Sequence, residues 1–175
     1  MACFFSSGAF SPDEAPSKLD ALAAFDIHSI EQPLQVGQWE AMATLCNNTP
    51  IPIALDEELI NVSDSEKQKM IELINPEYLI LKPSLLGGVK KCEDWITIAE
   101  KSNVKWWATS ALESNIGLNA IAQWVYKKTT NMKQVLGTGK LFSNNISSPY
   151  VIKEGELKYS TENNWDLSLF DHQKK

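Results

Sequence analysis

Short apolar runs alternate with amphipathic stretches along most of this chain. The apolar runs predict strands at 27–30, 51–55, 78–81, 104–109 and 134–136. Between them, helix-period segments predict helices at 38–47, 64–74, 89–102 and 115–127, with Ser63 or Asp64 capping the second. Strands that alternate with helices of this length indicate βαβ units, and βαβ units build a parallel sheet.

The last part of the chain follows a different pattern. Two runs, 150–153 and 157–160, flank Glu154-Gly155-Glu156, which predicts a β-hairpin. We therefore expect a helix-and-strand region at 1–142, followed by a loop, hairpin and tail at 143–175.

The expected strands end at regular intervals. Their carboxyl ends fall near Glu31, Asp56, Lys82, Ser110 and Gly137, in steps of 25, 26, 28 and 27 residues. Such a step is one βα unit, and both α/β barrels and doubly wound sheets bind ligands at these strand ends. The spacing alone does not choose between the two folds. With 175 residues the chain is also short for a complete eight-stranded barrel, which takes about 250.

Composition narrows the classes of function. The net charge is -6, and all 16 basic residues are lysine, so a nucleic-acid partner is not expected. No apolar run approaches the roughly 20 residues that span a membrane, and the start lacks a signal peptide's basic region. The three cysteines are an odd number without a CxxC motif, which favours a reducing compartment and no structural zinc. We expect a cytoplasmic protein.

Glu31 and Asp56 are candidate metal ligands. Each directly follows an apolar run, and one βα unit separates them, so their carboxylates would stand side by side at one edge of the sheet. Hard oxygen ligands of this kind suit Mg²⁺. Strand ends are usually polar, however, and on spacing alone ordinary loop acids explain the pair better than a metal site does.

Lys82 ends an apolar strand, which is an unusual place for an ammonium group. Near a metal it could act as a general base or stabilise developing negative charge. A lysine that extends its side chain to solvent explains the sequence equally well.

Two further segments contain candidate substrate-binding residues. Ser110 and Glu113 precede a helix that Ser114 or Asn115 could cap, so Glu113 could simply favour the helix start. Gly137-Thr138-Gly139 could hold a carboxylate on its backbone N–H groups, or could be an ordinary tight turn.

Five motifs occur together in the order and at the spacing of a known family. They are Ser-Ile-Glu-Gln-Pro, Ala-Leu-Asp-Glu-Glu, Leu-Lys-Pro-Ser-Leu-Leu-Gly-Gly, Thr-Ser-Ala-Leu-Glu-Ser-Asn-Ile-Gly and Leu-Gly-Thr-Gly. From about Gly8 to Phe142 the chain resembles the barrel domain of the enolase superfamily, in its mandelate racemase-like branch. Within that branch it resembles the o-succinylbenzoate synthase family of menaquinone biosynthesis. The resemblance implies a partial (β/α) TIM-type barrel, in which the C-terminal hairpin packs on a capping domain.

The resemblance also implies roles for the candidate residues. Glu31 and Asp56 match the second and third of three carboxylates that bind Mg²⁺, with Mn²⁺ as a possible substitute. The reaction removes a proton next to a carboxylate of a small-molecule substrate, passes through an enediolate and expels water. Lys82 matches a lysine that stabilises the intermediate electrostatically. The segment with Ser110 and Glu113, and the backbone of Gly137-Thr138, match the parts that hold the substrate.

The chain departs from the family pattern at Phe5. Family members carry the first metal-binding aspartate there, in Asp-Ala-Asn-Gly-Ala-Phe-Ser, whereas this chain reads Phe5-Ser6-Ser7-Gly8-Ala9-Phe10-Ser11. The family's capping domain, first strands and second catalytic lysine have no counterpart either. The expectation is a C-terminal portion of such an enzyme, inactive by itself, whose partner is the missing N-terminal capping half.

Three alternatives stay open. A dipeptide epimerase or N-acylamino-acid racemase of the same superfamily would share these motifs. A non-catalytic barrel fragment that acts only through a partner would explain Phe5. An unrelated doubly wound binding domain would lack an acidic pair at the strand ends.

Overall fold

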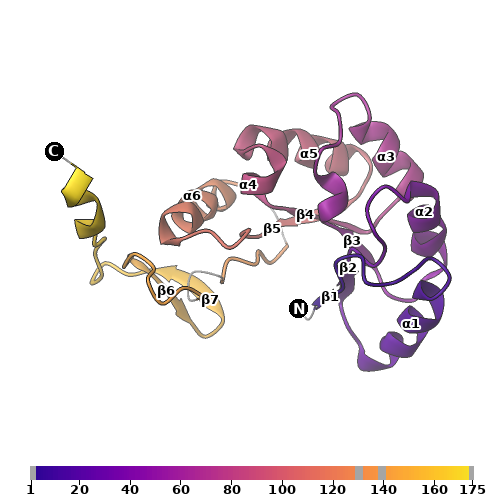
Figure 1. Ribbon diagram of the computed structural model, residues 1–175, viewed down its shortest axis with the longest axis horizontal. Coiled ribbons are helices and arrows are strands. Elements are labelled where there is room, and N and C mark those ends of the chain that lie inside the picture. Colours follow the sequence, from indigo (N-terminus) through magenta and orange to yellow (C-terminus); the bar gives the residue numbers. More distant parts are fainter. Residues whose placement is uncertain (1–2, 129–131, 138–140, 174–175) are drawn as a thin grey trace. The chain divides into compact units, whose positions relative to one another are not determined.

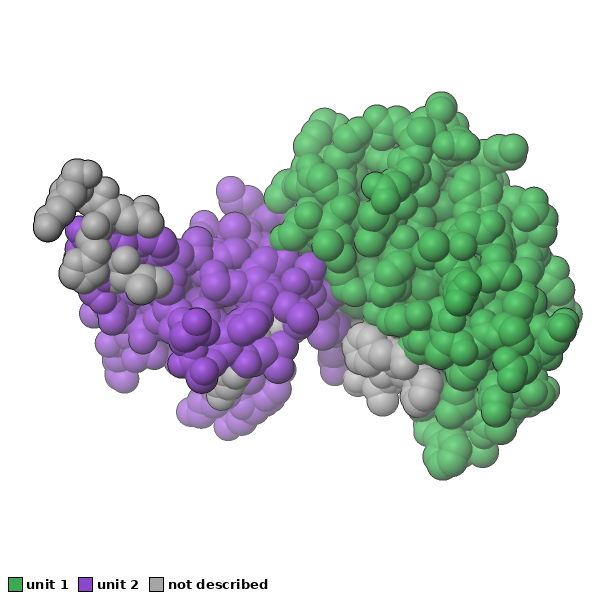
Figure 2. Space-filling view, viewed as in Figure 1, with its two compact units in different colours: residues 1–107 green, residues 108–175 purple. Residues whose placement is uncertain are grey.

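The computed structural model describes residues 3–128, 132–137 and 141–173. The chain forms two compact units, residues 1–107 and 108–175, which Figure 2 shows in green and purple.

A five-stranded sheet forms the centre of the first unit. Its strands are β1 (Cys3–Phe5), β2 (Ser29–Glu31), β3 (Ile53–Leu55), β4 (Tyr78–Leu81) and β5 (Lys105–Ala108), whose last residue already belongs to the second unit. They lie in the order β1-β2-β3-β4-β5, and the first three neighbouring pairs are parallel. Each βα unit therefore advances the sheet by one strand, as the sequence spacing predicts.

Helices follow one another along one side of this sheet (Figure 1). They are α1 (Ala15–Leu22), α2 (Trp39–Asn48), α3 (Lys67–Ile74), the short α4 (Pro83–Leu86) and α5 (Val89–Lys101), with 3-10 turns η1 (Ala23–Phe25) and η2 (Glu57–Leu59). The helix pairs α1–α2, α2–α3 and α3–α5 are in contact. The middle strands β2, β3 and β4 are buried along their whole length, which explains the continuous apolar sequences of β3 and β4.

The second unit contains α6 (Asn115–Tyr126), a hairpin of β6 (Tyr150–Lys153) and β7 (Glu156–Tyr159), and the 3-10 segment η4 (Ser168–Gln173). Glu154 and Gly155 connect the two strands with φ values of 56° and 76°. Two positive φ values in a two-residue connection indicate a type I′ turn, whose twist matches that of paired strands. The predicted hairpin is confirmed, with β7 beginning one residue earlier than expected. In the described part of the chain no helix has the length and apolarity needed to cross a membrane.

The helices α3 and α1 differ from the sequence prediction. The helix α3 begins at Lys67 with Glu66 as its N-cap residue, whereas Ser63 or Asp64 was expected to cap it. The reason is a preceding turn, in which the Ser63 carbonyl accepts from the amides of Glu66 (3.0 Å) and Lys67 (3.3 Å). The helix α1 was not predicted, because its apolar pattern is weak: only Ala15 and Leu19 are buried.

The predicted strand at 134–136 is a single parallel bridge between Thr109 and Val135. The Gln134 side chain explains why the pairing stops there. Its Oε1 accepts from the Ala108 amide at 2.7 Å, so a side chain takes a backbone donor that a continuing strand would use.

Candidate metal centre

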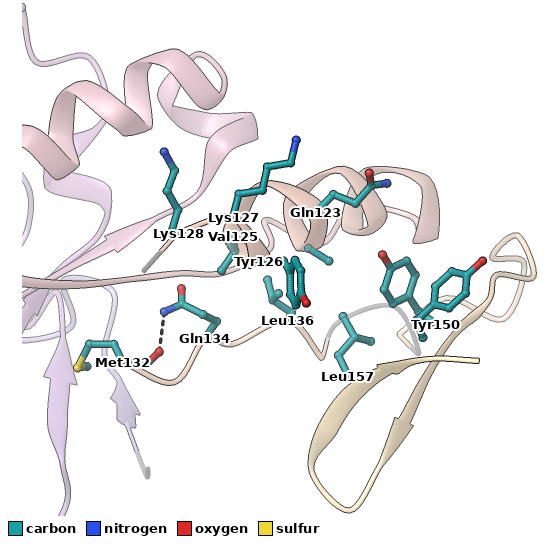
Figure 3. Close-up of a pocket in the computed structure, with 12 residues that line it drawn as sticks. Gln123, Val125, Tyr126, Lys127, Lys128, Met132, Gln134, Leu136, Tyr150 and Leu157 are labelled. Carbon is teal, nitrogen blue, oxygen red and sulfur yellow. Dashed lines mark hydrogen bonds between the residues drawn. The ribbon is translucent and has the colours of Figure 1, made fainter. Parts of the chain in front are cut away.

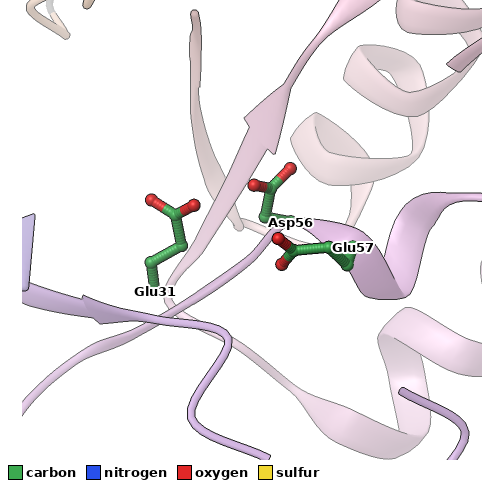
Figure 4. Close-up of side chains that lie close together, drawn as sticks. All are labelled: Glu31, Asp56 and Glu57. Carbon is green, nitrogen blue, oxygen red and sulfur yellow. The ribbon is translucent and has the colours of Figure 1, made fainter. Parts of the chain in front are cut away.

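Glu31, Asp56 and Glu57 converge at the carboxyl ends of two neighbouring strands. Glu31 is the last residue of β2, Asp56 directly follows β3, and both are buried. One carboxylate oxygen from each of the three residues lies within 4.8 Å of the other two. The three side chains point toward one another in Figure 4. Three carboxylates at this spacing are a possible site for a divalent cation.

Lys82 brings a positive charge to the same place. It directly follows β4, the next strand of the sheet. Its Nζ donates to Asp56 Oδ2 and lies 3.5 Å from Glu31 Oε1. Burial alone would lower the pKa of this ammonium, but the hydrogen bond to Asp56 and the surrounding carboxylates outweigh burial and raise it. Lys82 therefore places a positive charge beside Asp56 and Glu31.

The surroundings of Glu31 disfavour its charged form. Burial, followed by the hydrogen bond to Asp56 and the charge of Asp56, raises the pKa of Glu31 to about 8, although Lys82 acts in the opposite direction. A single ammonium group thus leaves the three carboxylates under-neutralised.

Glu57 supplies a second sign that a cation fits. Its Oε1 accepts from Ser7 Oγ at 3.3 Å, while its buried Oε2 has no hydrogen-bond partner in the described residues. Buried carboxylate oxygens are normally paired, and an orphaned one beside two more carboxylates suits a metal ion. The motif Ala-Leu-Asp-Glu-Glu places Glu57 next to Asp56 in the sequence, but the direction of the Glu57 side chain depends on the turn η2.

Phe5 occupies the strand end where the resemblance places the first ligand. The backbone of β1 pairs with β2 so that Phe5 is opposite Glu31. The side chain of phenylalanine has no ligand atom. The set of three carboxylates on the three successive strands β1, β2 and β3 is therefore incomplete in this chain.

The other candidate residues lie in the second unit. Ser110 is buried, and its Oγ accepts from the Leu112 amide at 3.1 Å. Glu113 Oε2 accepts from the Ala111 amide at 2.8 Å, and its side chain leaves so little space that a Cβ at Gly117 would lie 2.7 Å from it. Both side chains thus support the local turn. Gly137 is described, whereas Thr138 lies outside the described residues.

The second unit also has a cavity of its own, of about 620 Å³. It lies between α6, the segment around Gln134 and the hairpin, as Figure 3 shows. Its walls include Val125, Leu136 and Leu157, and among the described residues no carboxylate lines it. The cavity therefore has none of the metal-binding chemistry of the acidic cluster.

Parallel strands with helices between them, and acids and a lysine at successive strand ends, define an α/β-barrel type of enzyme domain. The family profile described as enolase C-terminal domain-like matches residues 6–163. The chain belongs to this family, as the five motifs predicted, and the expected fold class is confirmed.

Individual relatives agree with this assignment. The chain is 49% identical over 154 residues to a protein from Desulfotalea psychrophila named o-succinylbenzoate synthase. The matched region covers 88% of the chain and 42% of the relative. A crystal structure of MenC from the same organism superimposes with a TM-score of 0.85 at 48% identity, covering 89% of this chain and 44% of that one. A Maribacter protein named L-Ala-D/L-amino acid epimerase is 29% identical over 116 residues, or 66% of the chain and 33% of the relative. The chain thus spans less than half the length of the relatives that it matches.

Proposed function

We propose that this chain is the metal-binding part of an o-succinylbenzoate synthase, a carbon–oxygen lyase. The observation that carries the proposal is the convergence of Glu31, Asp56 and Lys82 at three successive strand ends, in a chain 49% identical to a relative with that name. The reaction expected from the resemblance removes a proton next to a carboxylate and then expels water.

The chain's own residues would divide this chemistry between them. Glu31, Asp56 and Glu57 would hold the divalent cation, Mg²⁺ or Mn²⁺, which when bound supplies positive charge to the enediolate. Lys82 would add a second positive charge from the neighbouring strand, in a buried site where such charge acts strongly. Ser110, Glu113 and the backbone of Gly137-Thr138 would hold the substrate, as the resemblance implies. We place the reaction in the cytoplasm, consistent with the free thiols of Cys46 and Cys92.

The proton-abstracting group would come from outside this chain. The resemblance assigns that role to a lysine upstream, in the part of the relatives that the chain does not span. We propose that the N-terminal capping half is the partner that completes the site, and that the chain without it has no turnover. Residues 143–175, with the hairpin, would pack on that half, and residues 1–142 would belong to the barrel.

A chimera tests the function. The upstream half of the Desulfotalea relative, including its first ligand strand, is fused to Gly8, and dehydration to o-succinylbenzoate is measured with and without chelator. We expect chelator-sensitive turnover, which Lys82→Ala lowers by about 10²–10³-fold because the intermediate loses a half-buried counter-charge. A folded chimera that dehydrates nothing contradicts the assignment, and a fully active Lys82→Ala variant contradicts the role of Lys82.

The same chimera separates the second candidate function. The 29% identical relative named an epimerase is the observation that favours it. Epimerisation of a dipeptide or racemisation of an N-acylamino acid, without dehydration, would replace the synthase assignment with this one. A chimera that is inactive on every substrate would leave the non-catalytic fragment as the better explanation of Phe5.

A further inference from the structure

Gln32, the residue after Glu31, is buried and its side chain is bonded at both ends. Its Oε1 accepts from the amides of Asp56 (3.3 Å) and Glu58 (3.2 Å). Its Nε2 donates to the Leu34 carbonyl and to Glu58 Oε2, both at 3.0 Å. One amide group therefore joins the end of β2 to the segment that follows β3.

Glu58 completes this arrangement from the other side. It is a buried carboxylate, and its Oε1 accepts from the Gly37 amide and from Trp39 Nε1, both at 2.8 Å. Among the described residues it forms no ion pair with a lysine, so neutral N–H donors from Gln32, Gly37 and Trp39 satisfy its charge. The carboxylate is thus held in one orientation, facing the Gln32 amide.

The two bonded amides lie on either side of Glu57. Fixing the amides of Asp56 and Glu58 fixes the turn that directs the Asp56 and Glu57 carboxylates. Gln32 itself has a φ of 40°, a left-handed conformation that costs energy in a residue other than glycine. Such a conformation persists only where its surroundings hold it, and here four hydrogen bonds of the Gln32 side chain do so.

We propose that Gln32 and Glu58 form a positioning clamp, which holds the Asp56-Glu57 turn so that its carboxylates meet Glu31 around a hard cation. The clamp touches neither the cation nor the substrate. The proposal rests on the metal centre of the proposed function and adds the residues that set its geometry. Outer groups that orient metal ligands typically change affinity by about 10–100-fold when they are lost.

The clamp can be broken and then rebuilt with donor and acceptor exchanged. Gln32→Glu places two carboxylates against each other and removes the donor to Glu58. Adding Glu58→Gln to that variant restores one amide and one carboxylate, with the donor now at position 58. The oxygen retained at position 58 can still accept from Gly37 and Trp39, and the carboxylate at position 32 can still accept from the backbone amides of residues 56 and 58. Only the hydrogen bond to the Leu34 carbonyl is not rebuilt.

The test is a Tb³⁺ titration of the full chain, followed by sensitised luminescence, with lifetimes in H₂O and D₂O to count bound waters. Asp56→Ala identifies the signal of this centre. We expect Gln32→Glu to bind Tb³⁺ about 10–100-fold more weakly, with more bound water, and the double variant to recover most of the affinity. Lys67→Met is the matched control, since Lys67 is also buried but pairs with Asp64 and lies over Trp95 on other elements. It should lower the melting temperature without changing the affinity or the water count.

The outcomes separate the clamp from the metal centre. If Asp56→Ala binds Tb³⁺ as the unmodified chain does, the centre fails and the clamp fails with it. If Asp56→Ala abolishes binding while Gln32→Glu retains full affinity, the clamp alone is overturned. If Gln32→Glu does not fold, the double variant decides: recovery of affinity with folding supports the clamp, and a folded double variant that binds weakly overturns it.

Discussion

Glu31 makes the acidic cluster sensitive to pH. Its pKa is raised from an ordinary value of 4.5 to about 8, so the folded chain holds a proton that the unfolded chain releases between these values. The stability from this group is therefore complete below about pH 4.5 and is lost as the pH rises through about 8.

Thermal melts in the presence of chelator measure this effect. The side chain of Glu31→Gln stays neutral, so this variant should match the unmodified chain near pH 4.5 and melt at a higher temperature at pH 8 and above. Parallel melting curves across that range would show that Glu31 does not carry the predicted proton.

Phe5 is expected to weaken cation binding. The isolated chain should bind Mg²⁺ weakly or undetectably, because Mg²⁺ dehydrates reluctantly and the first ligand of the family is absent. Phe5→Asp places a carboxylate at the strand end opposite Glu31 and should tighten binding by at least about tenfold. Under the proposed function it should give no turnover by itself, because the proposed proton-abstracting lysine is not supplied by these residues.

Calorimetry with Mg²⁺ checks the Phe5 prediction. Phe5→Asn is the control, because asparagine has nearly the same size as aspartate but no charge. Tight Mg²⁺ binding by the unmodified chain, lost in Asp56→Ala, would contradict it.

The residues of the centre were predictable to different degrees. Glu31, Asp56 and Lys82 could be found because each follows an apolar strand, and parallel strands bring such ends together. Gln32 could not be found in this way, since its role depends on a left-handed backbone and on two amides that lie 24 and 26 residues further along. Local sequence contains neither piece of information.

At the scale of elements, α5 shows why the long helices were predictable. It buries Cys92, Trp95, Ile96 and Ala99, which recur at helical spacing, so pattern and packing agree. The weakly patterned α1 was missed, and the strand expected at 134–136 is only a bridge at Val135, because tertiary contacts define both segments. In the second case the Gln134 side chain replaces a backbone acceptor.

Trp95 should be the main stabilising contact of α5. Its ring is 1% exposed and Lys67 Nζ lies 5.0 Å from its centroid. We expect Trp95→Ala to lower the free energy of unfolding by about 3–5 kcal/mol, since the helix would lose its largest buried side chain and leave a cavity.

Urea denaturation measures the loss at Trp95. Lys90→Ala on the same helix is the control, because the side chain of Lys90 is 79% exposed and pairs only with the nearby Asp94 in the described structure. Its effect should stay below about 0.5 kcal/mol. Equal effects of the two substitutions would show that α5 is not anchored through Trp95.

At the scale of the whole molecule, the sheet has an open end. β1 is its first strand, and on its outer side no described strand pairs with it. The chain covers 42% of the length of its Desulfotalea relative, and the unpaired backbone groups of an edge strand favour association with another chain.

We therefore expect the isolated chain to be marginally stable and to associate as its concentration rises. Sedimentation velocity across a concentration series measures this, and the chimera with the upstream half is the control, because its edge is covered. A monodisperse monomer with a sharp cooperative melt would contradict the expectation.

The ammonium of Lys82 lies beside the carboxylates of Asp56 and Glu31. We therefore expect folding of the chain not to depend on the supply of a metal ion. In many small metal-binding domains the bound ion stabilises the fold, and chelators therefore unfold these domains. Here part of the acidic charge is neutralised by a cation that the polypeptide itself carries. We therefore expect the loss of one metal ligand, as at Phe5 where the family carries an aspartate, to weaken cation binding more than it destabilises the fold. A chain of this kind can then lose its metal while it keeps the arrangement of strands that once bound it.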